Sequence, residues 1–429
     1  MLTNINFLKP NSTKTIQGFV ENIRNKNNIC FLVVKDVTGK IQVTVVKDKS
    51  NISEEFLQKI TPQSVVTIKG KIIENPNVKL NGVELIPDTI KLETIAASPL
   101  PIDNTSLIDT KLDYRWIDLR SERNQLIYKV QTYITNVMRQ WLFKKNFIEV
   151  HTPSLIGAAS ESGSDLFEVS NYFGKKAYLA QSPQFYKQMA ISGGFEKVLV
   201  VGPVFRAENS KTNKHATEFT GFDLEFAGVK SFKDVMKLEE QMLTYMLKQV
   251  HKKYGDEIAR VFNVPVVVPT TRFPTMSLKD IYVELEQRYG YTVPKIEQTD
   301  INAEGEKYVQ KLAMDKFNSE FMFVVGYSSE TRPFYHMRKN GIPQGFDLIW
   351  RGVEITSGAQ REHRYEILKK QAHEKGIDND VKFYLDFFKF GCPPHGGFGI
   401  GLDRLTMLLL GLTIKETEFV YRNPDRLNP

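Results

Sequence analysis

Cysteine is nearly absent from this sequence, which contains only Cys30 and Cys392 among its 429 residues. Two cysteines are too few for a disulfide framework or a zinc site, so we expect a reducing compartment, the cytoplasm. No window of about 18 consecutive apolar residues occurs, which argues against a membrane-spanning helix. The first residues, MLTNINFLKPNSTKT, lack the basic start and apolar run of a signal peptide. We therefore expect a protein without membrane association.

The overall composition is that of an ordinary globular protein, with 41% hydrophobic and 25% charged residues. The chain is long enough for more than one domain. Its formal net charge is +7. This mild basic excess suits a nucleic-acid partner without proving one.

The segment from residue 14 to residue 94 is rich in β-type runs. Turn residues at Thr38-Gly39 and Asn81-Gly82 punctuate the runs KTIQGFVENI, NICFLVVKDVTGKIQVTVVK, QSVVTIKGKII and GVELIPDTIKLE. The run NISEEFLQKI among them predicts a helix. Several short strands with one inserted helix indicate a small Greek-key barrel such as an OB-fold. We expect this domain over 1–95, followed by a Pro-containing linker or hinge over 96–122.

The remainder, 123–429, mixes helices and strands. Apolar residues recur at helical spacing over 123–146, which predicts a long amphipathic helix, and 232–254 predicts another. FIEVHTPSLI predicts a strand with Pro153 at an edge position. The stretches FMFVVGYSS, PQGFDLIWRGVEITSG and HGGFGIGLDRLTMLLLG predict a strand, a hairpin and a strand leading into a helix. Antiparallel strands separated by helices indicate an α+β domain.

The stretch FRAENSKTNKHATEFT, residues 205–220, gathers two acids, an arginine, a histidine and an aromatic in one polar loop. The flanks KVLVVGPVF and FTGFDLEF both predict strands, so the stretch reads as a hairpin with a long tip. Alternate residues of a strand share a face, so Arg206 and Glu208 are expected to point the same way. By itself the loop is either a solvated hairpin tip or a clamp for a ligand.

Two further stretches are weak signals on their own. ASESGSDLF, 159–167, is a Gly/Ser loop carrying Glu161 and is typical of a surface turn. QSPQFYKQ, 181–188, places Gln181, Gln184 and Lys187 near an apolar strand, where such side chains are commonly solvated.

The stretch GVEITSGAQREH, 352–363, sets Glu354 and Ser357 around an expected turn at Gly358, with Arg361 after it. A carboxylate and a hydroxyl oxygen can bind a Mg²⁺ ion that keeps waters and takes phosphate oxygens. A planar arginine suits recognition of a carboxylate. A structural Glu–Arg pair is the alternative when this stretch is taken alone.

The stretch GCPPHGGFGIGLDRL, 391–405, is rich in glycines, which let a backbone approach a ligand closely. Arg404 lies at the start of an apolar helix, where the helix N-terminus favours an anion such as phosphate. The glycines match neither a phosphate-binding loop nor a dinucleotide fingerprint. A nucleotide bound here would therefore lie on an antiparallel frame.

Together these stretches resemble the class II aminoacyl-tRNA synthetases. FRAENSKTNKHATEFT resembles their motif 2 and GIGLDRL their motif 3. The helix over 123–146 followed by EVHTPSL resembles motif 1, whose dimer-interface proline would be Pro153. QSPQFYKQ, GPVFRAENS, ITSGAQREH and GCPPHGGFGIGLDR jointly resemble aspartyl-tRNA synthetases of the archaeal and eukaryotic cytosolic kind. The resemblance covers essentially the whole chain. It implies a homodimer with an OB-fold anticodon-binding domain and a catalytic domain on an antiparallel sheet flanked by helices.

The resemblance implies an AMP-forming ligase. L-aspartate would react with ATP, with Mg²⁺ as the metal, to give aspartyl-adenylate, and aspartate would then pass to the 3′ end of tRNA(Asp); whether tRNA(Asn) is also charged stays open. The implied catalytic residues are Arg206 and Arg404. The implied ATP contacts are Arg206, Ala207, Glu208, Lys214, His215, Ala216, Phe219, Glu354, Gly401, Leu402, Asp403 and Arg404. The implied aspartate contacts are Glu161, Gln184, Lys187, Arg206, Ser357 and Arg361, and the implied Mg²⁺ ligands are Glu354 and Ser357.

Within that set, the resemblance gives Glu208 the adenine amino group and gives Phe219 stacking on the adenine ring. His215 and Arg404 would hold the γ-phosphate end. Lys214 stands where the family often has arginine, and lysine lacks the planar fork. We expect a weaker hold on the pyrophosphate end without loss of function.

The choice of amino acid is argued from Lys187 and Arg361, which would face the side-chain carboxylate of aspartate. In the similar asparaginyl enzymes the lysine position is typically apolar. Facing a neutral amide, Lys187 would be a buried charge without a partner, which is costly. This argument favours aspartate over asparagine.

In the barrel, the resemblance implies that Phe31 stacks on an anticodon base and that the amide of Gln42 reads a base edge. Arg24 is a candidate contact to a phosphate or a base. A place in the barrel core is the alternative for Phe31.

Two alternatives remain for the whole chain. An asparaginyl-tRNA synthetase is disfavoured by Lys187 and by the stretch GIGLDR. A non-catalytic class II paralogue would be expected to have lost Arg206, Glu354 or Arg404, and all three are present.

Overall fold

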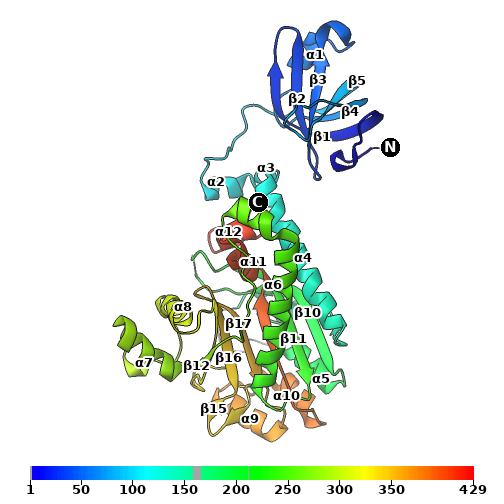
Figure 1. Ribbon diagram of the computed structural model, residues 1–429. Helices are drawn as coiled ribbons and strands as arrows, with labels where there is room; N and C mark the ends of the chain where they lie inside the picture. Colours follow the sequence, from blue (N-terminus) through cyan, green and yellow to red (C-terminus); the bar gives the residue numbers. More distant parts are fainter. Residues whose placement is uncertain (1, 158–165, 211) are drawn as a thin grey trace. The chain divides into compact units, whose positions relative to one another are not determined.

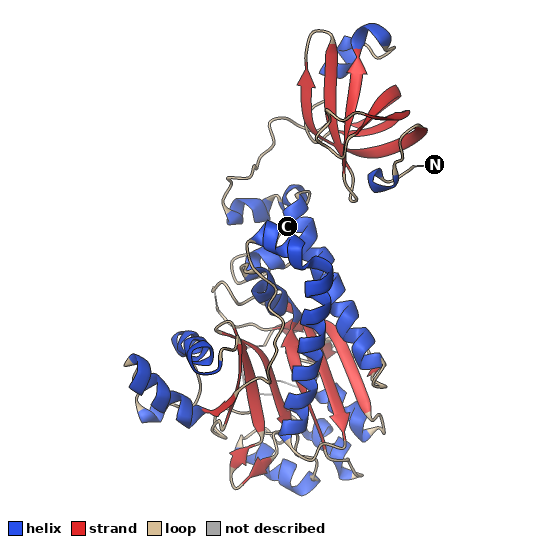
Figure 2. Ribbon diagram, viewed as in Figure 1, coloured by secondary structure: helices blue, strands red, loops and turns tan. Residues whose placement is uncertain are grey.

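The computed structural model describes residues 2–157, 166–210 and 212–429. The chain divides into two compact units, residues 1–105 and 106–429 (Figures 1 and 2). Within the described residues, the stretch expected to be a linker is partly helical. It contains α2 (Ile108–Asp113) and α3 (Arg115–Asp118), which belong to the second unit. The buried guanidinium of Arg115 holds this stretch in place, because it donates to the carbonyl oxygens of Glu416 and Glu418.

The first unit is a closed barrel with the strand order β1-β2-β3-β5-β4. Its strands are β1 (Ser12–Asn25), β2 (Ile29–Lys35), β3 (Lys40–Val46), β4 (Val65–Glu74) and β5 (Val83–Thr94). Helix α1 (Glu54–Gln58) lies between β3 and β4, and two 3-10 turns cover Ile5–Phe7 and Lys47–Lys49. Alternate residues of β2, among them Cys30 and Leu32, pack in the barrel core. The predicted OB-type barrel with an inserted helix is confirmed.

The second unit is built on an eight-stranded sheet with the order β12-β13-β16-β17-β18-β11-β10-β6. Its strands are β6 (Ile148–Glu149), β10 (Lys197–Phe205), β11 (Glu218–Ala227), β12 (Thr275–Ser277), β13 (Phe321–Val325), β16 (Gly345–Trp350), β17 (Val353–Gln360) and β18 (His395–Gly401). The pairs β6–β10 and β12–β13 at the two edges are parallel, and the other neighbours are antiparallel. The predicted α+β fold on a largely antiparallel sheet is therefore confirmed.

Smaller sheets and helices surround this frame. The small strands are β7 (Leu155–Ile156), β8 (Glu168–Tyr172), β9 (Lys175–Leu179), β14 (Arg338–Lys339) and β15 (Ile342–Pro343). The long helices are α4 (Glu122–Phe143) and α6 (Phe232–Phe262). The shorter helices are α5 (Gln184–Ser192), α7 (Leu278–Tyr289), α8 (Ala303–Phe317), α9 (Tyr365–Glu374), α10 (Lys382–Lys389), α11 (Leu402–Leu410) and α12 (Ile414–Thr417), with a 3-10 turn at Lys295–Glu297.

The two faces of the sheet differ in character. Helices α4 and α6 run side by side across one face (Figure 1), and their apolar residues form one core with Phe222 and Leu224 of β11. Side chains alternate along a strand, so Asp223 and Glu225 point to the opposite face. The helix-covered face is therefore apolar, and the other face carries charged groups.

One sequence-based strand assignment is wrong. FIEVHTPSLI is not one strand: β6 pairs with β10, β7 pairs with β9 of another sheet, and Pro153 lies in the irregular segment between them. Proline lacks the N–H that a ladder requires, so the chain changes sheets there. The residues Gln184 and Lys187, expected near an apolar strand, belong to helix α5, which begins after Pro183 and packs against β10 and β11.

Glycine is required at position 397 by a close approach between strands. A Cβ atom there would lie 2.0 Å from the carbonyl oxygen of Leu224 and 2.4 Å from Oε2 of Glu225. Such overpacking forces backbone shifts. Gly202 of strand β10 in the same sheet is a matched contrast, since nothing lies within 4 Å of a Cβ atom at that position.

We expect Gly397→Ala to lower the free energy of unfolding of the second unit by about 1–3 kcal/mol, whereas Gly202→Ala changes it by less than about 0.5 kcal/mol. Chemical denaturation followed by tryptophan fluorescence measures both. Equal losses in the two variants would contradict the steric argument.

Candidate active site

A cavity of about 440 Å³ opens on the charged face of the sheet. Strands β11, β17 and β18, helix α5 and the loop between β10 and β11 all contribute to its lining. Many of the residues expected to bind substrates lie together around it. These are Gln184, Lys187, Arg206, Glu208, Lys214, His215, Ala216, Phe219, Glu354, Ser357, Arg361, Gly401, Asp403 and Arg404.

Several expected residues lie elsewhere. Ala207 is not among the lining residues, and Leu402 packs into the apolar core instead. Pro153 borders a separate, smaller cavity of about 120 Å³. Glu161 lies outside the residues that the structure describes.

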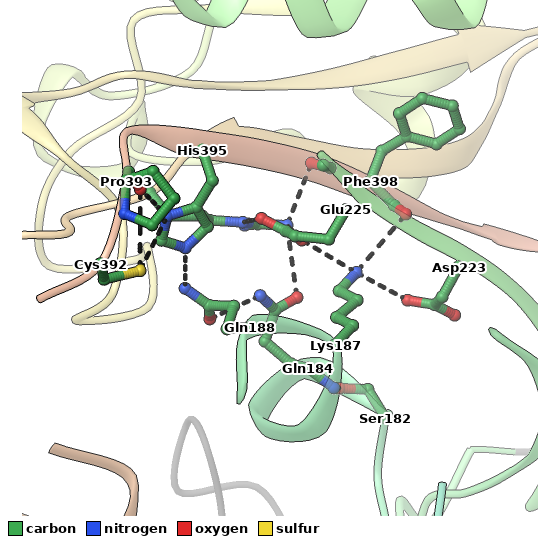
Figure 3. A network of polar contacts seen from close by, with 12 residues as sticks. Ser182, Gln184, Lys187, Gln188, Asp223, Glu225, Cys392, Pro393, His395 and Phe398 are labelled. Carbon is green, nitrogen blue, oxygen red and sulfur yellow. Dashed lines mark hydrogen bonds and ion pairs between the residues drawn. The ribbon is translucent and has the colours of Figure 1, made fainter. Parts of the chain in front are cut away.

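One end of the cavity is a buried cluster of two cations and two acids (Figure 3). Nζ of Lys187 lies 2.9 Å from Oδ1 of Asp223 and 3.6 Å from Oε2 of Glu225. Nε of Arg361 donates to Oε1 of Glu225 at 3.0 Å. Lys187 is 1% exposed, Arg361 3% and Glu225 0%, so these charges are compensated by each other rather than by bulk water.

This cluster overturns one step of the sequence argument. Lys187 was expected to be an unpaired charge unless the substrate brought a carboxylate. Asp223 and Glu225 already pair it inside the protein. A neutral amide substrate would therefore not leave Lys187 without a partner, and the lysine alone does not decide between aspartate and asparagine.

The glycines of β18 serve these acids. They were expected to let the backbone approach a ligand. A Cβ atom at Gly397 would meet the carboxylate of Glu225, and one at Gly399 would lie 2.6 Å from Oδ1 of Asp223. These two glycines thus make room for buried carboxylates of the neighbouring strand, and Gly399, like Gly401, also lines the cavity.

The hairpin predicted around residues 205–220 is formed by β10 and β11, which pair as far as Phe205 and Glu218. Arg206 and Glu208 lie beyond the end of β10 in irregular structure, so the expected strand alternation does not apply to them. Their side chains nevertheless lie 3.7 Å apart. The guanidinium carbon of Arg206 is also 5.6 Å from the centre of the Phe219 ring. The arginine, the acid and the aromatic therefore border one part of the cavity.

Glu354 and Ser357 were expected to lie around a turn, but both lie within strand β17. The ladder between β16 and β17 shifts register between Leu348 and Ile349, which leaves Ile355 as an extra residue. The side chain of Ile355 packs in the apolar core, and Glu354 and Ser357 both line the cavity, as does part of Ile355. A bulge of this kind re-aims side chains, and so brings two residues three positions apart to one face.

The Glu354 carboxyl has an environment that disfavours its charge. Burial and the nearby Asp347 raise its pKa to about 7, against the opposing effect of Arg404 and Arg332. The Ser357 hydroxyl accepts a hydrogen bond from Arg332, whose guanidinium also pairs with both carboxylate oxygens of Asp347. A cation bound between Glu354 and Ser357 would favour the ionised carboxylate.

Arg404 joins helix α11 to the loop between β10 and β11. Its guanidinium donates to the carbonyl oxygen of Glu354 at 2.7 Å and to that of Lys214 at 3.3 Å. Lys214 forms an ion pair with Glu306 of α8. Burial, together with Arg404 and Lys214, lowers the pKa of His215, so this imidazole is neutral near pH 7. The carboxylate of Asp403 has a structural role, since its oxygens accept hydrogen bonds from the backbone N–H of Thr220 and from Nε2 of Gln131.

The sequence analysis missed several charged residues of this site, namely Asp223, Glu225, Glu306, Arg332 and Asp347. For Asp223 and Glu225, the sequence contains a pattern that could have revealed them. In FTGFDLEF the acids alternate with Phe222 and Leu224, which on a strand places two carboxylates on one face opposite an apolar one. Glu306 and Arg332 approach from distant parts of the chain and had no such signal.

The expected base-reading residues of the barrel lie on its outer side. Phe31 is half-buried and not part of the barrel core, so its alternative place in that core is excluded. The guanidinium carbon of Arg24 lies 5.5 Å from the centre of its ring. The Gln42 amide nitrogen donates to Thr44 Oγ1 at 3.1 Å and to Glu84 Oε2 at 3.2 Å. Its carbonyl oxygen therefore faces away from those partners.

An OB-type barrel joined to a largely antiparallel sheet with a charged cavity is the architecture of class II aminoacyl-tRNA synthetases. The family profile described as "tRNA synthetases class II (D, K and N)" matches residues 108–420, and that described as "OB-fold nucleic acid binding domain" matches residues 14–93. The chain belongs to this class II synthetase family and is an aminoacyl-tRNA ligase.

Individual relatives agree with this assignment. The chain is 37% identical to "Aspartate--tRNA(Asp) ligase" of Pyrococcus abyssi, over 96% of this chain and 95% of the relative. It is 36% identical to "Aspartate--tRNA(Asp/Asn) ligase" of Aeropyrum pernix, over 96% and 94%. Among solved structures, asparaginyl-tRNA synthetase from Pyrococcus horikoshii complexed with asparaginyl-adenylate matches with a TM-score of 0.90 and 30% identity, over 100% of both chains.

We expect Glu225→Gln to lower the free energy of unfolding by about 3–5 kcal/mol at pH 7, because it leaves Lys187 and Arg361 with one acid between them. Glu257→Gln, which removes an acid from an exposed pair with Arg260 on α6, provides the matched control and should leave stability unchanged.

The pH dependence gives a second check. Burial raises the pKa of Glu225, but Arg361 and Lys187 lower it by more, to below the ordinary 4.5. Its stabilising contribution is thus present above pH 4.5 and lost as the pH falls through the folded-state pKa. Below pH 4.5, the free energy of unfolding of Glu225→Gln should therefore depend less steeply on pH than that of the wild type. Identical acid profiles for variant and wild type would contradict the pairing.

Proposed function

We propose that this chain is an aspartate–tRNA ligase. The observation that carries the proposal is its similarity, over 96% of its length, to relatives described as aspartate–tRNA ligases. Lys187 and Arg361 line the cavity as donors, but Asp223 and Glu225 already pair them, so the choice of aspartate rests on the relatives and not on these charges. The close match to an asparaginyl enzyme shows that the fold does not separate the two amino acids.

The reaction has two steps. A carboxylate oxygen of the α-carboxylate of aspartate attacks the α-phosphorus of ATP, and the bond to the β-phosphate oxygen breaks to release pyrophosphate. The terminal ribose hydroxyl of the tRNA then attacks the aspartyl carbonyl carbon, and AMP leaves. The attacking carboxylate is already ionised at pH 7, so positioning and charge neutralisation are the main tasks of the protein.

Arg206 is proposed to contact the α-phosphate, with Phe219 beneath the adenine and Glu208 at its amino group. The proximity of these three side chains supports this arrangement. Arg404 and His215 are proposed to face the outer phosphates. Lys214 can join them if it exchanges its ion pair with Glu306 for one with phosphate. The other proposed contacts, Ala207 and Leu402, would act through their backbone, because neither side chain lines the cavity.

Mg²⁺ is the proposed metal, held by Glu354 and Ser357. Among the described residues, no group of three or more His, Cys, Asp or Glu side chains could hold a metal by itself. Mg²⁺ often takes one or two protein oxygens and completes its shell with waters and phosphate oxygens, which these two residues fit. The ion would supply positive charge to the phosphates and would favour the ionised form of Glu354.

The barrel is proposed to bind the anticodon through Phe31, Gln42 and Arg24. Its family description as a nucleic-acid binding domain and the position of these residues outside the barrel core support this role. A homodimer formed through 123–153, including Pro153, and a cytoplasmic location are part of the proposal. Both cysteines are free, which fits a reducing compartment. In the part of the chain that is described, no helix is long and apolar enough to cross a membrane.

The first experiment is charging of purified tRNA(Asp) and tRNA(Asn) with labelled aspartate in parallel. We expect tRNA(Asp) to be charged, because the matched relatives share that activity in their descriptions. Charging of tRNA(Asn) as well would show a barrel that tolerates both anticodons. If neither tRNA accepts aspartate while labelled asparagine is transferred, the asparaginyl alternative is correct.

Lys187→Leu tests the amino-acid end of the cavity. We expect kcat/KM for aspartate in ATP–pyrophosphate exchange to fall about 100-fold or more, because a buried charged contact is lost, while KM for ATP changes little. Lys248→Leu removes an exposed lysine of α6 and serves as the control. Normal activation of aspartate by the Lys187 variant would refute the assignment of this pocket.

A further inference from the structure

Behind the cavity, a chain of hydrogen bonds runs from His395 through Gln188 and Gln184 to Arg361 (Figure 3). Its inner members are closed off from water: Gln188, His395 and Tyr384 are each 0% exposed. Gln184 and Arg361 line the cavity, whereas Gln188 does not. Gln188 is therefore one step removed from any bound substrate.

The donor-to-acceptor direction of this series of hydrogen bonds is fixed at the histidine end. Nδ1 of His395 lies 2.8 Å from the carbonyl oxygen of Pro393, which can only accept, so Nδ1 carries the proton. Burial lowers the pKa of His395 to about 4, so the ring is neutral near pH 7. Its Nε2 must then accept, and Nε2 of Gln188 donates to it at 2.9 Å.

The remaining bonds follow from this orientation. With its nitrogen on His395, Gln188 turns Oε1 toward Gln184 and accepts from Nε2 of that residue at 2.7 Å. The hydroxyl of Tyr384 donates to the same oxygen at 3.0 Å. Gln184 then turns its own oxygen toward NH2 of Arg361, at 3.2 Å. A guanidinium can only donate, so the two ends of the chain agree on one orientation for both amides.

We propose that Gln188 is a positioning residue for amino-acid binding, which acts by locking the Gln184 amide with its oxygen toward Arg361. The proposal rests on the proposed function, in which this end of the cavity holds the amino acid. Without Gln188, the Gln184 amide can rotate and present its NH2 group to the guanidinium. Two donors would then face each other, and Arg361 would lose an acceptor that holds it in place.

The test is Gln188→Met, which keeps the length of the side chain and removes its hydrogen bonds. We expect KM for aspartate in ATP–pyrophosphate exchange to rise about 10- to 100-fold, with kcat and KM for ATP within about threefold of wild type. A purely structural role would instead lower kcat, the affinity for ATP and the thermal midpoint together. An unchanged KM for aspartate would overturn the proposal.

A double variant asks whether Gln188 acts through Gln184. If it does, KM for aspartate in Gln184→Met/Gln188→Met will equal that of Gln184→Met alone, since the residue being positioned is already gone. Multiplying effects would show that Gln188 acts by another route, and would also overturn the proposal.

Tyr384→Phe keeps the amide and removes one of the two donors to its oxygen, so it provides the test if Gln188→Met does not fold. We expect a rise in KM for aspartate of about two- to fivefold, which disappears in the Gln184→Met background. The wild-type protein is assayed with aspartate and asparagine in the same experiment. Activation of asparagine alone would contradict the proposed function, and the Gln188 variants would then be compared on asparagine.

Discussion

Two carboxylates on strand β11 organise the catalytic unit. Asp223 and Glu225 project from the face of the sheet opposite the core and hold Lys187 and Arg361 in a nearly water-free cluster. Charges in such surroundings are stable only when each has partners with good geometry. The residues that neighbour the two acids are arranged so that each buried charge has such partners.

Strand β18 illustrates this dependence. It runs beside β11, and its glycines leave the volume that the two acids occupy. Helix α5 brings Lys187 from one side, while Arg361 follows β17 and donates to the carbonyl oxygen of Gly397. The cluster therefore ties together three segments that are far apart in sequence. Its charges balance internally, so the pocket can remain assembled before an amino acid arrives.

The part of the cavity beside the β10–β11 hairpin is built differently. Its arginine, acid and aromatic side chains lie at the end of the β10–β11 hairpin, and Arg206 is half-exposed. Backbone carbonyl oxygens of Glu354 and Lys214 orient Arg404. A preorganised cluster at one end of the cavity and a more open hairpin end suit the proposed reaction, in which charge on phosphate must be neutralised and pyrophosphate must leave. Relatives with this fold are described as aspartate or asparagine enzymes, so the fold alone does not choose between the two amino acids.

The sequence by itself determined the barrel, the β10–β11 hairpin and the long helices, because hydrophobic periodicity is a local property of the chain. Many of the residues around the cavity followed from the resemblance of its motifs to the class II synthetases. The tertiary structure decided what those residues do for one another. The pairing of Lys187 with Asp223 and the ion pair of Lys214 with Glu306 join segments far apart in sequence. The bulge that turns Glu354 and Ser357 to one face depends on the register between β16 and β17. Pairings of this kind depend on which faces meet in the folded sheet, and no local pattern in the chain encodes them.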